Sequence, residues 1–195
     1  MSHTVRIAPL QPPYEPQVAQ QLAKWMPPGS GIEPLALFRT LAVHDELSSR
    51  MRPLGAGILG SRVVDPMLRE VMIARTCALC GAEYEWGVHA VAFAGPLGLT
   101  PEQLFSTVHG GPEDHCWNTL QRNIIRLADE LHHANSVSDE LFSDLDADLD
   151  HQQILELAVT AGWYHTIAYV LGVAGVEFEP WAARFPAASD RGTQS

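Results

Sequence analysis

The sequence is poor in features that mark several broad classes of protein. Only 3 of its 195 residues are cysteines, an odd and sparse count that excludes a disulfide-stapled scaffold and indicates reduced thiols. Lysine and arginine number 12 against 23 acidic residues, and a net charge of −11 argues against a nucleic-acid partner. No segment shows the alternation of apolar and polar residues that predicts a β-strand.

Long apolar runs are also scarce. We find none near the roughly 18 residues that a bilayer-crossing helix needs. The residues that follow Met1 do not resemble a secretory signal, in which a charged segment precedes an apolar one. We therefore expect a cytoplasmic protein without a membrane partner.

What the sequence does contain is apolar residues at helical spacing. They make up 46% of the chain, enough for a globular core. Helices are predicted near Val18 to Trp25 and over residues 33–50, 67–76, 82–95, 101–108, 113–133, 138–145 and 150–172, with residues 52–60 as a Gly-rich connector. We therefore predict an all-α fold. Its expected parts are an N-terminal extension (1–32) with one short helix, a single helical domain (33–185) and a flexible tail (186–195).

Two adjacent predicted helices carry the ionisable residues of interest. Glu85 and His89 are four positions apart, so their side chains lie on one helix face about one turn apart. A carboxylate beside an imidazole raises its proton affinity, and such a pair can transfer protons in catalysis. Glu70 lies on the preceding helix. By spacing alone, Glu85 and His89 could equally form an exposed helix pair, and Glu70 could be a surface carboxylate.

A Cys-x-x-Cys motif, Cys77 to Cys80, lies between these two groups. Such a motif can be a redox dithiol, provide half of a zinc site, or consist of packed thiols. No second such motif follows, so a zinc site would need distant partners such as His109, His115 or Cys116. The other histidines, among them His132 and His165, are scattered, and we interpret them as solvated or core residues.

The central segment resembles the core signature of the carboxymuconolactone decarboxylase family, within the alkyl hydroperoxidase D-like (AhpD-like) superfamily. The matching runs are Leu68-Arg69-Glu70, Glu83-Tyr84-Glu85-Trp86-Gly87-Val88-His89 and Gly98-Leu99-Thr100-Pro101-Glu102. A softer likeness extends the match to about residues 35–180. The resemblance implies an AhpD-like helical domain with a central helix pair, assembly as a homo-oligomer, and chemistry without a metal or organic cofactor.

The hydroperoxidase branch of the superfamily carries a CxxCxxxH motif, with a glutamate twelve residues before its first cysteine. His89 matches the histidine of that motif, and Glu70 matches the glutamate. Ala82 and Glu85 stand where the two cysteines would be, and the local Cys-x-x-Cys is displaced five residues toward the N-terminus. The displacement puts peroxidase activity in doubt.

Three functions remain open. The first is acid–base chemistry on a small carboxylate or lactone, with His89 as acid or base, Glu85 tuning it and Glu70 completing a relay. Tyr84, Trp86 and Arg69 are then candidates for binding the substrate. The second is a thiol peroxidase or disulfide reductase that uses Cys77 and Cys80. The third is a non-catalytic, oligomeric binding protein.

Overall fold

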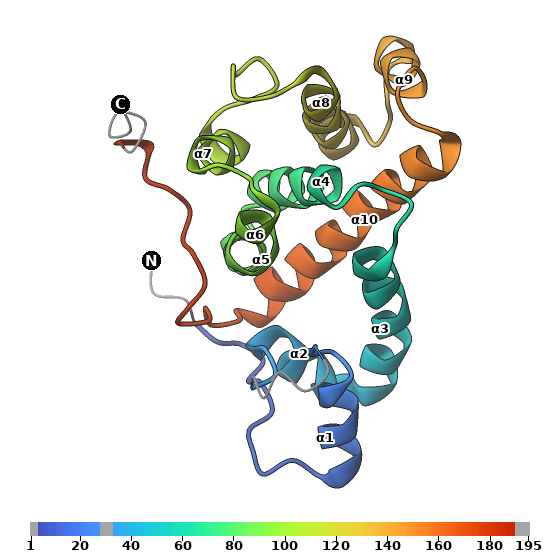
Figure 1. Cartoon of the computed structure of the whole chain (residues 1–195). Coiled ribbons are helices and arrows are strands. Elements are labelled where there is room, and N and C mark those ends of the chain that lie inside the picture. Colours follow the sequence, from blue (N-terminus) through green and yellow to red (C-terminus); the bar gives the residue numbers. More distant parts are fainter. Residues whose placement is uncertain (1–3, 28–32, 190–195) are drawn as a thin grey trace. The chain divides into compact units, whose positions relative to one another are not determined.

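The computed structural model describes residues 4–27 and 33–189, and the regular elements among them are all helical (Figure 1). The predicted all-α class is therefore confirmed for this part of the chain. The α-helices are α1 (Pro16–Ala23), α2 (Ala36–Leu41), α3 (Asp45–Gly60), α4 (Pro66–Leu79), α5 (Glu83–His89), α6 (Gly95–Leu97), α7 (Pro101–His109), α8 (Thr119–Ala134), α9 (Asp139–Asp146) and α10 (His151–Ala174).

The chain divides into two compact units. Of the described residues, 4–27, 33–61 and 169–180 form the first unit, which holds α1 to α3 and the end of α10. Residues 62–168 and 181–189 form the second, which holds α4 to α9 and most of α10. All of the residues proposed from the sequence for the site belong to the second unit. The domain boundaries expected from the sequence stay a prediction.

In the first unit, the predicted connector over residues 52–60 was wrong. These residues form the second half of α3, and Pro53 lies inside the helix. The predicted helix over residues 33–50 is instead divided between α2 and α3 by a 3₁₀ turn, Ala42–His44. The glycines misled the prediction, because tertiary packing, here burial of Ile58, outweighs intrinsic helix propensity.

Helix α4 is the centre of the second unit, where it packs against α5, α7 and α8 (Figure 1). It starts at Pro66, one residue before the predicted helix over 67–76, because the Asp65 carboxylate accepts hydrogen bonds from the backbone N–H groups of Met67 and Leu68. Nearly every side chain from Leu68 to Cys77 is buried. The core around it includes fully buried residues of α8, α9 and α10: Ile124, Ile125, Leu141, Leu145 and Leu157.

The end of α4 is a Schellman turn. Gly81 has φ +63°, a conformation that favours glycine. The N–H of Ala82 donates to the carbonyl of Cys77 at 2.8 Å, and the N–H of Gly81 donates to that of Ala78 at 3.0 Å. The turn lies in the gap between the predicted helices over 67–76 and 82–95, and it places Cys80 at the helix cap.

The second predicted helix of the central pair is less regular than expected. Helix α5 ends at His89, and residues Ala90–Ala94 continue as a π-helix before α6. Ala183 and Arg184 lie against α5: the N–H of Ala183 donates to the carbonyl of Gly87, and Arg184 forms an ion pair with Glu83 at 2.9 Å. Position 87 requires glycine, because a Cβ atom there would collide with the carbonyl oxygen of Ala183.

Helix α10 is long and apolar enough to cross a membrane by length and composition, with a mean hydropathy of 1.3 over its most apolar 18 residues. The sequence analysis had underestimated this run. Of that window, 44% is buried inside the protein, and a core helix passes the same test. The absence of a membrane partner and the cytoplasmic location therefore stay predictions.

Candidate active site

Three residues singled out in the sequence meet inside the second unit. Glu70 comes from the middle of α4, and Glu85 and His89 come from one face of α5. Their exposed fractions are 0%, 8% and 3%. The alternative in which Glu70 is a surface carboxylate and Glu85 and His89 form an exposed pair is therefore wrong.

The imidazole of His89 has a partner at each nitrogen. Nδ1 lies 2.7 Å from Oε2 of Glu70, and Nε2 lies 2.9 Å from the hydroxyl of Tyr164 on α10. Oε1 of Glu85 is 3.6 Å from Nε2. The short contact to a carboxylate is thus made by Glu70, whereas from the sequence we expected Glu85 to be the group that tunes the imidazole. The carboxylate of Glu70, the imidazole of His89 and the phenol of Tyr164 are therefore linked by hydrogen bonds in the core.

This environment makes the imidazole a cation. Burial alone would lower the pKa of His89, but the charge and hydrogen bond of Glu70, followed by those of Glu85, raise it to about 9. Burial, together with the charges of Glu85 and Glu70, raises the pKa of Tyr164 well above its usual value. At neutral pH, His89 is therefore an imidazolium ion and Tyr164 a neutral phenol.

The carboxylates are not fully satisfied. Oε1 of Glu70 and Oε2 of Glu85 are buried and accept no hydrogen bond within the described residues. Nε of Arg69 lies 4.0 Å from Oε1 of Glu70, an ion pair beyond hydrogen-bonding distance. Because a buried acceptor without a donor costs about 1–3 kcal/mol, such groups are often explained by function.

The two cysteines of the Cys-x-x-Cys motif differ in how deeply they are buried. Both thiols are free. Cys77 is fully buried, and burial together with the charge of Glu85 raises its pKa well above the usual value. Cys80 is half-buried, and burial raises its pKa as well. Neither environment favours the thiolate, which is the nucleophilic form of cysteine.

The residues proposed for binding a substrate are all buried. Trp86 donates from Nε1 to Oγ1 of Thr107 at 3.0 Å and packs edge-on against Phe185, as a core side chain would. Tyr84 is 4% exposed, and Arg69, at 6%, pairs with Glu70. Their assignment to a substrate stays a prediction.

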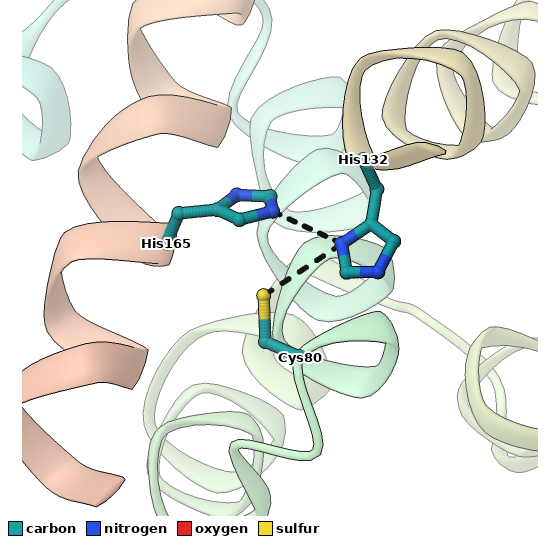
Figure 2. A group of neighbouring side chains, drawn as sticks. All are labelled: Cys80, His132 and His165. Carbon is teal, nitrogen blue, oxygen red and sulfur yellow. Dashed lines mark hydrogen bonds between the residues drawn. The ribbon is translucent and has the colours of Figure 1, made fainter. Parts of the chain in front are cut away.

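A second cluster brings together Cys80, His132 of α8 and His165 of α10 (Figure 2). Each offers a ligand atom, and the three atoms lie within 4.8 Å of one another. Within the described residues, no other group of three histidine, cysteine or acidic side chains comes this close. His109, once considered as a partner of the thiols, instead lies 2.7 Å from the carbonyl oxygen of Pro186.

Sequence reasoning missed Tyr164, His132 and His165. Tyr164 lies 75 positions from His89, and His132 and His165 lie 52 and 85 positions from Cys80. Helical periodicity relates residues within a few turns, so it carries no signal across such separations. Tyr164 did fall within the softer part of the family resemblance.

Comparison with known proteins supports the fold. Neither a protein-family profile nor a curated protein matches the sequence. Among solved structures, the debrominase Bmp8 superposes with a TM-score of 0.72 at 15% identity, covering 92% of this chain and 95% of that one. A cysteine-to-alanine variant of Bmp8 in complex with 2,3,4-tribromopyrrole gives 0.72 at 16% identity, covering 91% and 94%.

An uncharacterized peroxidase-related protein from Silicibacter sp. TM1040 superposes with a TM-score of 0.77 at 14% identity, covering 95% of this chain and 100% of that one. Identities this low establish similarity of fold. Both neighbours have folds of the AhpD-like and carboxymuconolactone decarboxylase type. The AhpD-like fold predicted from the central motif is therefore confirmed for this chain.

Proposed function

We propose that the protein is an enzyme that transfers protons to or from a small carboxylate or lactone, with His89 as the acid or base. The observation that carries this proposal is the pair of short contacts at the two nitrogens of His89, 2.7 Å to Glu70 and 2.9 Å to Tyr164. A histidine bound at both nitrogens by titratable groups is oriented for proton transfer.

Each of the three residues around His89 has a distinct role in this proposal. Glu70, with no exposed surface, holds Nδ1 and stabilises the imidazolium form. Tyr164 stays a neutral phenol, and its hydroxyl oxygen accepts the hydrogen bond of the protonated Nε2 and so orients the ring. Glu85 is the most exposed of the four at 8%, and its Oε2 accepts no hydrogen bond from the described residues. In this proposal Glu85 therefore faces the substrate and links it to Nε2 of His89, 3.6 Å away.

Acid–base chemistry fits these residues better than thiol chemistry does. A nucleophilic cysteine needs a lowered pKa and partial exposure, usually next to a cation or a helix N-terminus. Cys77 has no exposed surface and faces the negative charges of Glu85 and Glu70, which raise its pKa. Cys80 lies at the C-terminal end of α4, where the helix dipole disfavours a thiolate.

The test is a panel of small carboxylates and lactones incubated in deuterated buffer, with NMR detection of deuterium incorporation and of released carbon dioxide. For any substrate found, His89→Gln is expected to lower kcat/KM by about 10²–10⁴-fold, the usual contribution of a general acid or base. Glu70→Gln is expected to lower it and to shift the pH profile. His151→Gln replaces an exposed histidine of α10 and serves as the matched control. Full activity in His89→Gln would exclude the proposal.

A second candidate function is thiol oxidoreduction. It is favoured by the fold neighbours, which include a debrominase studied as a cysteine variant and a peroxidase-related protein. It requires Cys80 as the reacting thiol, since Cys77 is fully buried. Consumption of an organic hydroperoxide that is lost in both Cys80→Ser and Cys77→Ser would favour this candidate over acid–base chemistry.

A further inference from the structure

Cys80, His132 and His165 converge from three helices of the second unit, and each directs a ligand atom toward the other two (Figure 2). Nδ1 of His132 lies 3.0 Å from Nε2 of His165 and 4.0 Å from Sγ of Cys80. All three side chains are half-buried. The cluster plays no part in the acid–base chemistry proposed above.

The hydrogen bonds of His165 leave its inward nitrogen as an acceptor. Nδ1 of His165 lies 2.9 Å from the carbonyl oxygen of Ala161, one turn earlier in α10. A carbonyl only accepts, so Nδ1 carries the proton and Nε2 presents its lone pair to the cluster. Metal-binding histidines are oriented in the same way, by a hydrogen bond from the nitrogen that does not bind the metal.

The hydrogen bond between the two imidazoles marks where a cation would lie. Because Nε2 of His165 is an acceptor, the 3.0 Å contact needs a proton on Nδ1 of His132. Neutral imidazoles are the form that binds metal ions, and a metal ion displaces such a proton.

The spacing fits a zinc ion. With Zn–N bonds of about 2.0–2.1 Å and Zn–S bonds of about 2.3 Å, tetrahedral ligand atoms lie roughly 3.3–3.6 Å apart. The distances from Nδ1 of His132 to Nε2 of His165 and to Sγ of Cys80 differ from this range by less than about 0.5 Å. The third distance, between Sγ of Cys80 and Nε2 of His165, is at most 4.8 Å and so exceeds the range by at most about 1.2 Å. Nitrogen and sulfur ligands select zinc over magnesium or calcium, which prefer oxygen.

We propose that Cys80, His132 and His165 form a zinc site with three protein ligands and a fourth position open to water or a small ligand. Such a Cys-His-His set with an open position is the pattern of zinc sites that act on a bound molecule. From the sequence we expected no metal, and His109 and His115 were the histidines considered as zinc ligands. The proposed site departs from that expectation.

The test is direct metal binding by the full chain. Protein stripped with a chelator is titrated with Zn²⁺ and, separately, with Co²⁺, and bound metal is quantified by mass spectrometry. One ion per chain and a thiolate-to-cobalt charge-transfer band are expected. Cys80→Ser should abolish that band. His132→Gln should weaken zinc binding by more than the roughly 10–100-fold that changes around a metal site's ligands cost.

Matched controls separate the cluster from other thiols and histidines. Cys116→Ser removes a half-buried thiol outside the cluster, and His151→Gln removes an exposed histidine; both should bind zinc as the wild type does. In the wild type, zinc should protect Cys80 but not Cys116 from alkylation by iodoacetamide, a measurement that needs no variant. Substoichiometric binding, binding unchanged by Cys80→Ser, or alkylation of Cys80 unaffected by zinc would overturn the proposal.

Discussion

The second unit holds two histidine sites that differ in their neighbours. His89 is fully buried and lies beside the carboxylates of Glu70 and Glu85, which raise its pKa to about 9. His132 is half-buried beside a thiol and another imidazole, and its pKa is lowered. One site therefore favours the protonated imidazole and the other the neutral one. The comparison teaches that nearby carboxylates can outweigh the effect of burial on a histidine, as at His89, whereas at His132 burial and the neighbouring imidazole act in the same direction.

The largest expected effect is a difference in how much an alanine substitution at each site lowers the free energy of unfolding. His89→Ala leaves Glu70 buried without its cation, and breaking a buried ion pair in this way costs about 3–5 kcal/mol. His165→Ala, measured in chelator, removes the hydrogen bonds of the imidazole to His132 and to the carbonyl of Ala161, and should cost about 1–2 kcal/mol. Urea unfolding of both variants checks this, and similar costs for the two would contradict the contrast.

A smaller change in the free energy of unfolding is expected when the pH is raised. The pKa of His89 is raised from 6.5 to about 9 by folding, so its stabilisation is complete below about pH 6.5 and is lost as the pH rises through 9. The loss should reach about 3 kcal/mol, at 1.36 kcal/mol per pKa unit. The free energy of unfolding of the wild type minus that of His89→Gln, measured from pH 6 to 10, should fall over this interval. A difference that stays flat would show that folding does not raise the pKa of His89.

The smallest loss of stability is expected from a substitution at Tyr164. Tyr164→Phe removes the hydroxyl partner of Nε2 of His89 while keeping the ring, and should cost about 1–3 kcal/mol because a buried donor loses its acceptor. Denaturant unfolding gives the cost, and the substrate assay gives the change in activity. If Tyr164→Phe is as stable as the wild type, Glu85 must take over the contact with Nε2.

Much of the second unit could be predicted because its signals are local. Asp65-Pro66 marks the start of α4, and Thr100 and Gln103 form the capping box that starts α7. Glu85 and His89 share a helix face by their spacing alone. That Glu70 lies near them followed from the family resemblance and not from periodicity, since no local rule relates positions on separate helices.

The unpredicted part depends on tertiary packing. The contact of His89 with Tyr164, and the meeting of Cys80 with His132 and His165, both require the packing of α10 to be known. Patterns of apolar residues show that α10 is buried but not which of its polar side chains face α4 and α5. Helix α8 also begins at Thr119, six residues later than residue 113, because its capping box uses Asn118 and Gln121.

The turn at Gly81 makes the two sites separable. Cys80 occupies the last position before that turn, whereas Glu70 lies nearly three turns earlier in α4. Adding or deleting one residue at the helix end would swing the Cys80 thiol by about 100° away from both imidazoles and leave the register of Glu70 unchanged. A change in the length of α4 at its C-terminal end could therefore abolish metal binding by Cys80 and leave the position of Glu70 intact.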